Sequence, residues 1–148
     1  MTVDRLGMTV LSQDECFELL GEAQVGRLAV SIGLHPDIFP INYVVDGASI
    51  VFRTAEGTKL AASVLTPHIA FEADGVIDGS DEAWSVVVKG HAREIERLPE
   101  LLDALDLPLY PWQVAPKHRF VRITPDEVSG RRFAVVDPTV WTAGVPVS

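Results

Sequence analysis

One stretch of the chain, from Phe39 to Lys59, constrains the fold more than any other. Two runs rich in β-branched and aromatic residues flank Asp46-Gly47, and this dipeptide in such a setting is the strongest short-range signal of a β-hairpin. The pattern predicts a strand from Ile38 to Val45, a tight turn, and a second strand from Ile50 to Thr54. Pro40 indicates an edge, a bulge or an irregular start in the first of these strands.

Short strands separated by turn residues continue along the rest of the chain. Further strands are predicted at 25–32, 68–73, 83–94 and from Arg119 onward, with a bulge at Gly90. Helices are predicted from Ser12, whose capping box with Glu15 starts a helix that should end near Ala23, and at 59–64 and 98–105. The remaining segments are expected to be a loose arm at 1–10, a turn at 33–36, and loops at 74–82 and 108–116. Six or more mostly antiparallel strands with short helices favour a mainly β fold of barrel type.

Composition points to one globular domain covering residues 1–148. A chain of 148 residues with 47% hydrophobic content can form a core without disulfides or metals, and we expect that core to span about residues 11–133, followed by a tail at 134–148. The net charge of −9 disfavours nucleic acid as a partner. The single cysteine, Cys16, excludes an internal disulfide and is expected to be a small buried apolar residue. No apolar run approaches the ~20 residues needed to span a bilayer, so we expect a cytoplasmic protein without membrane contact.

Three polar residues at the end of the predicted hairpin suggest an anion site. Arg53 and Thr54 end the second strand, and a short loop through Gly57-Thr58 leads to Lys59 at the start of a helix. A guanidinium, hydroxyls, loop amides and an ammonium around one point suit a phosphate. The alternative is a solvated strand end with ordinary surface charges, and spacing alone does not separate the two.

Polar and aromatic residues on other strands could hold a flat ring. Asn42 and Tyr43 lie in an otherwise apolar strand, although Tyr43 could equally be a core aromatic. Trp84 and Ser85 open a later strand, and Trp84 taken alone favours a core position. Trp112 follows Pro111 in a rigid loop, where it could cap a pocket, cross a subunit interface or plug the barrel. A phosphate at one end and a heterocycle at the other describe flavin mononucleotide, FMN.

Other chemistries find little support in the pattern. The four histidines, at 35, 68, 91 and 118, show no metal-ligand spacing, so no metal site is expected. Gly-rich dinucleotide and P-loop motifs are absent, as is the G-x-S-x-G elbow of serine hydrolases. Gly130-Arg131-Arg132 suggests a turn with solvated charges, with a phosphate or interface contact as the alternative.

The ordered set of segments resembles the pyridoxamine 5′-phosphate oxidase-like family, in particular its small flavin-binding members from actinobacteria. The segments that carry this resemblance are VGRLAV, FPINYVVDG, IVFRTAEGTK, WSVVVKGHA, the Pro-Trp pair and the closing GRRF, over roughly residues 11–133. The resemblance implies a split β-barrel and a homodimer with two FMN sites at the subunit interface. It assigns Arg53, Thr54 and Lys59 to the phosphate, and Asn42 and Tyr43 to the ring. It also assigns Trp84 and Ser85 to the adjoining wall, and Trp112 to an approach from the partner subunit.

The tail departs from true pyridoxamine phosphate oxidases, because AVVDPTVWTAGVPVS lacks their basic, histidine-bearing segment. The resemblance therefore implies an FMN-dependent oxidoreductase that moves hydride or electrons from a reduced donor to a small conjugated acceptor. Alternatives are a reductase that uses the deazaflavin coenzyme, and a flavin- or haem-binding carrier or sensor without turnover. No residue stands out as a catalytic acid or base.

Overall fold

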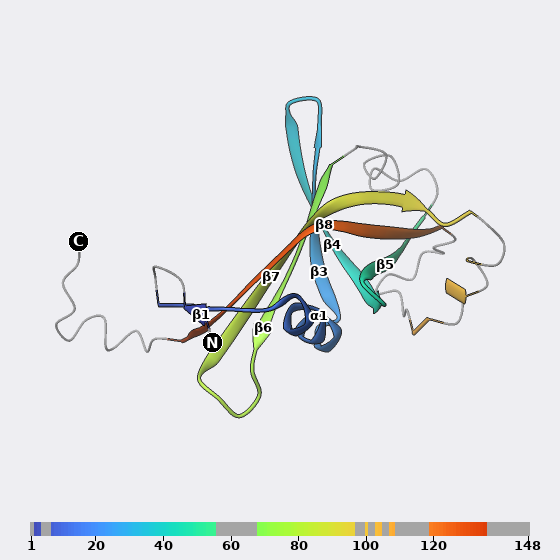
Figure 1. Cartoon of the computed structure of the whole chain (residues 1–148). Coiled ribbons are helices and arrows are strands. Elements are labelled where there is room, and N and C mark those ends of the chain that lie inside the picture. Colours follow the sequence, from blue (N-terminus) through green and yellow to red (C-terminus); the bar gives the residue numbers. More distant parts are fainter. Residues whose placement is uncertain are drawn as a thin grey trace.

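The computed structural model describes residues 2–3, 7–55, 68–96, 100, 103–104, 107–108 and 119–135. Within these ranges helix α1 (Gln13–Glu22) accompanies a single antiparallel sheet of eight strands (Figure 1), and Glu100, Asp103 and Ala104, in the helix predicted at 98–105, are also helical. The strands are β1 (Thr2–Val3), β2 (Thr9–Val10), β3 (Val25–Ile32), β4 (His35–Asp46), β5 (Ser49–Thr54), β6 (Ile69–Val76), β7 (Glu82–Glu94) and β8 (Arg119–Ala134).

The sheet closes into a barrel. Its strand order is β1-β2-β8-β5-β4-β3-β6-β7, and β7 also pairs with β8, so the last six strands form a ring. The closure is uneven: β7 and β8 pair along almost their whole length, whereas β3 and β6 pair only from Arg27↔Glu72 to Ala29↔Ala70. Figure 1 shows the β3–β4 and β6–β7 hairpins extending away from the ring in opposite directions. This architecture confirms the predicted split β-barrel.

The core lies inside the ring, where alternate residues of each strand meet. Phe52, Phe71, Val86 and other inward side chains are fully buried, and α1 adds Cys16 and Leu20 to the same cluster. Burial removes hydration from the Cys16 thiol and raises its pKa. The expectation of a buried, apolar cysteine is confirmed.

Helix α1 begins as predicted. The Ser12 side chain accepts a hydrogen bond from the Glu15 amide, and the Glu15 carboxylate accepts one from the Ser12 amide. Both bonds satisfy amides that a helix start otherwise leaves without an acceptor. The helix ends at Glu22, and Ala23 is already extended.

Two tight hairpins shape the central part of the sheet. Gly47 has φ of 60° in the turn between Asp46 and Ser49, which confirms the predicted Asp-Gly hairpin. A second hairpin, with Gly33 at φ 63°, joins β3 to β4. The predicted turn at 33–36 is confirmed at Gly33-Leu34 but is shorter than expected, and the predicted strand start at Ile38 was wrong, because β4 begins at His35. The part of β4 that contains Pro36 and Pro40 pairs only with β3 among the described strands. One side of this part therefore needs no hydrogen-bond donors, which is where a proline is tolerated in a strand.

Three other boundaries differ from the predictions. The arm at 1–10 was predicted to be loose, but its described end Thr9–Val10 is a strand that pairs with Arg131 and Arg132 of β8. The strand predicted to end at Ala73 continues to Val76, and the expected loop at 74–82 is only a short turn. Asp74 can lie within the strand because Arg27 on the neighbouring strand forms an ion pair with its carboxylate. The bulge at Gly90 is confirmed by a register shift between Lys89 and Gly90. The predicted helix at 59–64 lies outside the described residues, as do most of 98–105, most of 108–116 and the tail from residue 136.

Candidate functional site

The outer face of β4, β5 and β8 carries a row of three side chains from three strands. The β4–β5 ladder ends at the pair Tyr43 and Phe52, and Asn42 and Arg53 are the next residues of the two strands, both facing away from the core. Arg53 in turn pairs with Phe120 of β8, and its guanidinium carbon lies 4.9 Å from the centre of the Phe120 ring. This is a cation–π arrangement, which holds the half-buried guanidinium flat against an apolar support. The structure thus brings together two predicted site residues, Asn42 and Arg53.

An apolar cluster lies beside this row on the same face. It contains the buried residues Val51, Ile95, Ala104 and Phe120, with Val44 and Leu107 packed against them. The amide of Ile95 donates to the carbonyl of Phe120 at 2.8 Å, which ties the chain after β7 to the edge of β8. The face therefore places a half-buried cation and a half-buried amide beside a buried apolar cluster, and these two polar groups suit an anionic ligand.

Ion pairs surround the cluster and use most of the nearby basic side chains. Arg119 binds Glu94 through two nitrogens, and Arg122 binds both Asp46 and Glu100. A hydrogen bond from Arg119 lowers the pKa of Glu94, and hydrogen bonds from Arg93 and then Arg122 lower the pKa of Glu100, so both carboxylates remain charged near neutral pH. These arginines anchor the segment that follows β7 and are occupied by protein carboxylates.

Three predicted site residues point into the core instead. Tyr43 is 4% exposed, donates to the Leu20 carbonyl at 2.6 Å and packs edge-on against Phe71. Thr54 and Trp84 are each 2% exposed, and Trp84 lies close to Gly75. Their assignment to a cofactor stays a prediction, while their position in this chain is that of core residues.

Ser85 lies on the outer face but far from Arg53. It pairs with Arg131, whereas Arg53 pairs with Phe120, and these two partners lie eleven positions apart on β8. At about 3.3 Å per residue this is roughly 36 Å along the strand. Arg53 and Ser85 of one chain therefore lie toward opposite ends of β8. The other two predicted site residues, Lys59 and Trp112, lie outside the described residues.

Reasoning from the sequence missed Phe120 and the ion pairs of Arg122. The signal for Phe120 was present, because it precedes alternating apolar residues on the last strand. Its position next to Arg53, however, depends on the register between β5 and β8, which are separated by a long stretch of chain. No local pattern specifies that register.

Comparison with known proteins assigns the fold to a family. The model of the pyridoxamine 5′-phosphate oxidase family matches residues 12–132, so the chain belongs to this family. Among solved structures, an FAD-binding protein from Mycobacterium smegmatis is 37% identical with a TM-score of 0.76, covering 85% of this chain and 98% of its own. A Corynebacterium glutamicum protein named as a pyridoxamine 5′-phosphate oxidase is 39% identical with a TM-score of 0.79, covering 88% and 96%. An FAD-binding protein from Mesorhizobium loti is 26% identical with a TM-score of 0.70, covering 86% and 99%. In the described part of the chain, no helix is long and apolar enough to cross a membrane.

Proposed function

We propose that this protein is a flavin-binding oxidoreductase that holds the cofactor phosphate at Arg53. The observation that carries the proposal is the row of Asn42, Arg53 and Phe120 on the outer face of the barrel. A guanidinium is a bidentate donor for phosphate oxygens, and the Asn42 amide adds a neutral donor and acceptor. The buried apolar cluster beside the row supports the Arg53 side chain through Phe120. Lys59, which follows this strand end in the sequence, is proposed as a second phosphate ligand.

Two nucleotides compete for this role. FMN is the proposed cofactor, because its terminal phosphate matches Arg53 on the outer face together with Lys59, which follows in the sequence. FAD is the second candidate, since the structures from M. smegmatis and M. loti are both named as FAD-binding proteins. Either nucleotide would supply hydride or electron transfer when bound, while the chain's own residues bind the phosphate, shield the ring from water and orient the substrate.

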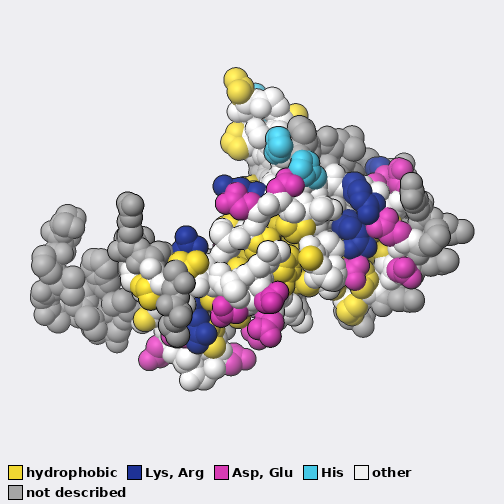
Figure 2. All heavy atoms as spheres, in the orientation of Figure 1, with side chains coloured by type: hydrophobic (Ala, Val, Ile, Leu, Met, Phe, Trp, Pro, Cys, Tyr) yellow, Lys and Arg dark blue, Asp and Glu magenta, His cyan; other side chains and the backbone are white. Residues whose placement is uncertain are grey.

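The charge distribution disfavours the deazaflavin coenzyme with its oligoglutamate tail. The densest basic segment of the sequence runs from Lys117 to Arg132, but three of its arginines already pair with carboxylates: Arg119 with Glu94, Arg122 with Asp46, and Arg132 with Glu82. On the face shown in Figure 2, the basic patches are small and separated, and most border acidic side chains. An oligoglutamate tail would need a continuous basic groove.

We further propose a homodimer in which each flavin contacts both chains. Arg53 and Ser85 lie toward opposite ends of β8, so a single cofactor that contacts both residues takes them from different chains. In this arrangement Asn42 and Arg53 come from one subunit, and Ser85 comes from the other. Trp112 is proposed as a second contact from the partner subunit.

Flavin titration tests the phosphate assignment. FMN, FAD and riboflavin are titrated into flavin-free wild type, Arg53→Ala and the control Arg27→Ala. The control removes a guanidinium of β3 that binds Glu72 and Asp74 on β6. Losing one charged phosphate contact costs about 2–3 kcal/mol, which corresponds to roughly 30- to 150-fold weaker binding. We expect this loss for FMN with Arg53→Ala only, and almost none for riboflavin. Wild type that binds riboflavin as tightly as FMN would contradict the assignment.

A mixing experiment tests the shared site. Arg53→Ala and Ser85→Trp each remove one half of the site, and the two variants are coexpressed with different tags to isolate mixed dimers. One of the two sites in a mixed dimer contains intact Arg53 and intact Ser85, so flavin binding should recover to about half of the wild-type stoichiometry. Mixed dimers that bind no flavin would show that both residues serve a site within one chain. Turnover with NADPH and a quinone then distinguishes an oxidoreductase from a carrier.

A further inference from the structure

Two histidines that are distant in the sequence meet beside the bulge of β7. The rings of His68 and His91 lie 5.5 Å apart, centre to centre, with their planes tilted by 48°. His91 Nδ1 also lies 2.9 Å from the Asp126 carboxylate on β8. His68, Gly90 and Asp126 line a pocket here, and His91 lies next to it through its contacts with His68 and Asp126.

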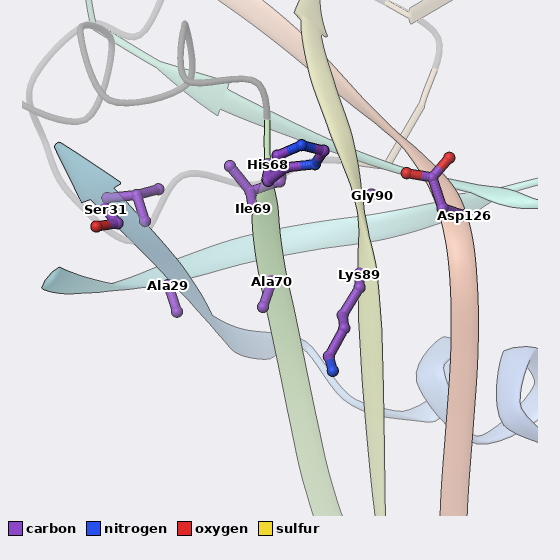
Figure 3. Close-up of a pocket in the computed structure, with 9 residues that line it drawn as sticks. Ala29, Ser31, His68, Ile69, Ala70, Lys89, Gly90 and Asp126 are labelled. Carbon is purple, nitrogen blue, oxygen red and sulfur yellow. The ribbon is translucent and has the colours of Figure 1, made fainter. Parts of the chain in front are cut away.

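The pocket occupies the outer face of β3, β6 and β7 and has a volume of about 470 Å³, within the range of small-molecule sites. Its central surface is unusually flat, because Ala29 pairs with Ala70 across β3 and β6, and Ala70 pairs with Lys89 across β6 and β7. Figure 3 shows the two alanine side chains between the strands, with Lys89 at one end of the pocket and His68 at the other. A flat apolar surface with polar groups at its ends suits a planar ring.

The charged side chains around the pocket determine whether it favours an anionic or a cationic ligand. Asp126 also lines the pocket, and its carboxylate lies against His91 Nδ1, which can donate a hydrogen bond to it. Lys89 makes no ion pair with any described residue, even though Glu127 stands opposite it in the β7–β8 ladder. The ammonium group at the pocket end is therefore available to a ligand. An incoming carboxylate would meet a cation at this end and imidazole nitrogens at the other.

We propose that this pocket is a binding site for a small planar molecule with one negative charge, such as an aromatic carboxylate. Its ring lies on the Ala29–Ala70 surface, its anionic group contacts Lys89, and His68 offers a hydrogen bond at the far end. The site is separate from the row of Asn42, Arg53 and Phe120, which lies on β4, β5 and β8. Binding at this pocket does not depend on the identity of the flavin.

Fluorescence titration with 2-naphthoate tests the proposal on the full chain, both as purified and after removal of any flavin. Neutral 2-naphthamide has nearly the same shape and serves as the matched probe, and 2-naphthylmethylammonium carries the opposite charge. We expect naphthoate to bind most tightly. Lys89→Gln should weaken naphthoate binding about threefold to fivefold, the range for an exposed ion pair, and leave naphthamide unchanged.

A steric pair of variants locates the bound probe. Ala70→Leu fills the flat surface and should weaken naphthoate binding at least tenfold. Ala83→Leu is the control, because Ala83 is also a half-buried alanine on β7 but does not line the pocket. Ala29→Leu replaces Ala70→Leu if circular dichroism shows that the latter is unfolded. Naphthoate affinity that is unchanged in Ala70→Leu and in Ala29→Leu would overturn the proposal. So would a preference for the ammonium probe, or a dimer that binds no naphthoate because its partner subunit fills the pocket.

Discussion

Tyr43 provides a sharp test of the described core, because its hydroxyl is both buried and hydrogen-bonded. Its phenol donates to the carbonyl of Leu20, which lies in the last turn of α1, where carbonyls lack amide donors from the helix itself. Tyr43→Phe removes this bond and leaves the Leu20 carbonyl buried without that donor. We expect the free energy of unfolding at pH 8 to fall by about 1–2 kcal/mol.

The same residue predicts a pH dependence with a definite sign. Burial, followed by the nearby Glu72 carboxylate, raises the pKa of Tyr43 well above its ordinary value of 10.0. A group whose pKa is raised in the folded state stabilises the fold fully below its unfolded pKa and loses this contribution as pH rises toward the folded pKa. Between pH 8 and pH 11 the wild type should therefore lose about 1.4 kcal/mol relative to Tyr43→Phe. The advantage of the wild type at pH 8 should nearly vanish at pH 11.

Urea denaturation of both proteins at the two pH values measures this difference. Tyr110→Phe, which removes the only other tyrosine of the sequence, is the matched control. If the difference in the free energy of unfolding between wild type and Tyr43→Phe is the same at pH 8 and at pH 11, the phenol of Tyr43 is not buried as described. Flavin titration of Tyr43→Phe then separates the two roles considered for this residue. If Tyr43 is only a core residue, Tyr43→Phe should bind flavin with unchanged affinity. If it contacts the flavin ring, as predicted from the sequence, the variant should bind flavin more weakly.

Three further substitutions test local features by the same denaturation assay. Ser12→Ala removes the side-chain acceptor of the Glu15 amide and should cost about 1 kcal/mol. Gly90→Ala would place a methyl group against the Thr124 carbonyl at the bulge, and it should cost about 1–3 kcal/mol. Gly21→Ala has open space around its new methyl group within α1, so it should instead stabilise the protein by about 0.5–1 kcal/mol. A stabilised Gly90→Ala or a destabilised Gly21→Ala would contradict the described backbone at these positions.

The sequence predicted those parts of the fold that depend on neighbouring residues. The capping box at Ser12 and the turn at Gly47 were found because a few adjacent side chains decide them. The early start of β4 at His35 was missed because Pro36 disfavours a strand unless one side of it needs no hydrogen-bond partner. That condition is a property of the assembled sheet.

Pairings between distant segments account for the other errors. Residues 9–10 become a strand only because the far end of β8 offers an edge for them to join. Likewise, Asp74 is acceptable within β6 because Arg27, from a strand much earlier in the chain, provides its counter-charge. Both facts arise from register and topology, and the local composition of these segments indicates a loop.

The site itself shows how the two-residue period of a strand limits predictions built on adjacent pairs. Asn42 and Tyr43, Arg53 and Thr54, and Trp84 and Ser85 were each assigned together to one cofactor. Successive side chains of a strand point to opposite faces, so only one member of each pair can line the outer surface. In all three pairs the core takes the other member: Tyr43, Thr54 and Trp84. The core members therefore govern stability, while Asn42, Arg53 and Ser85 are the positions at which substitutions should change binding without unfolding the barrel.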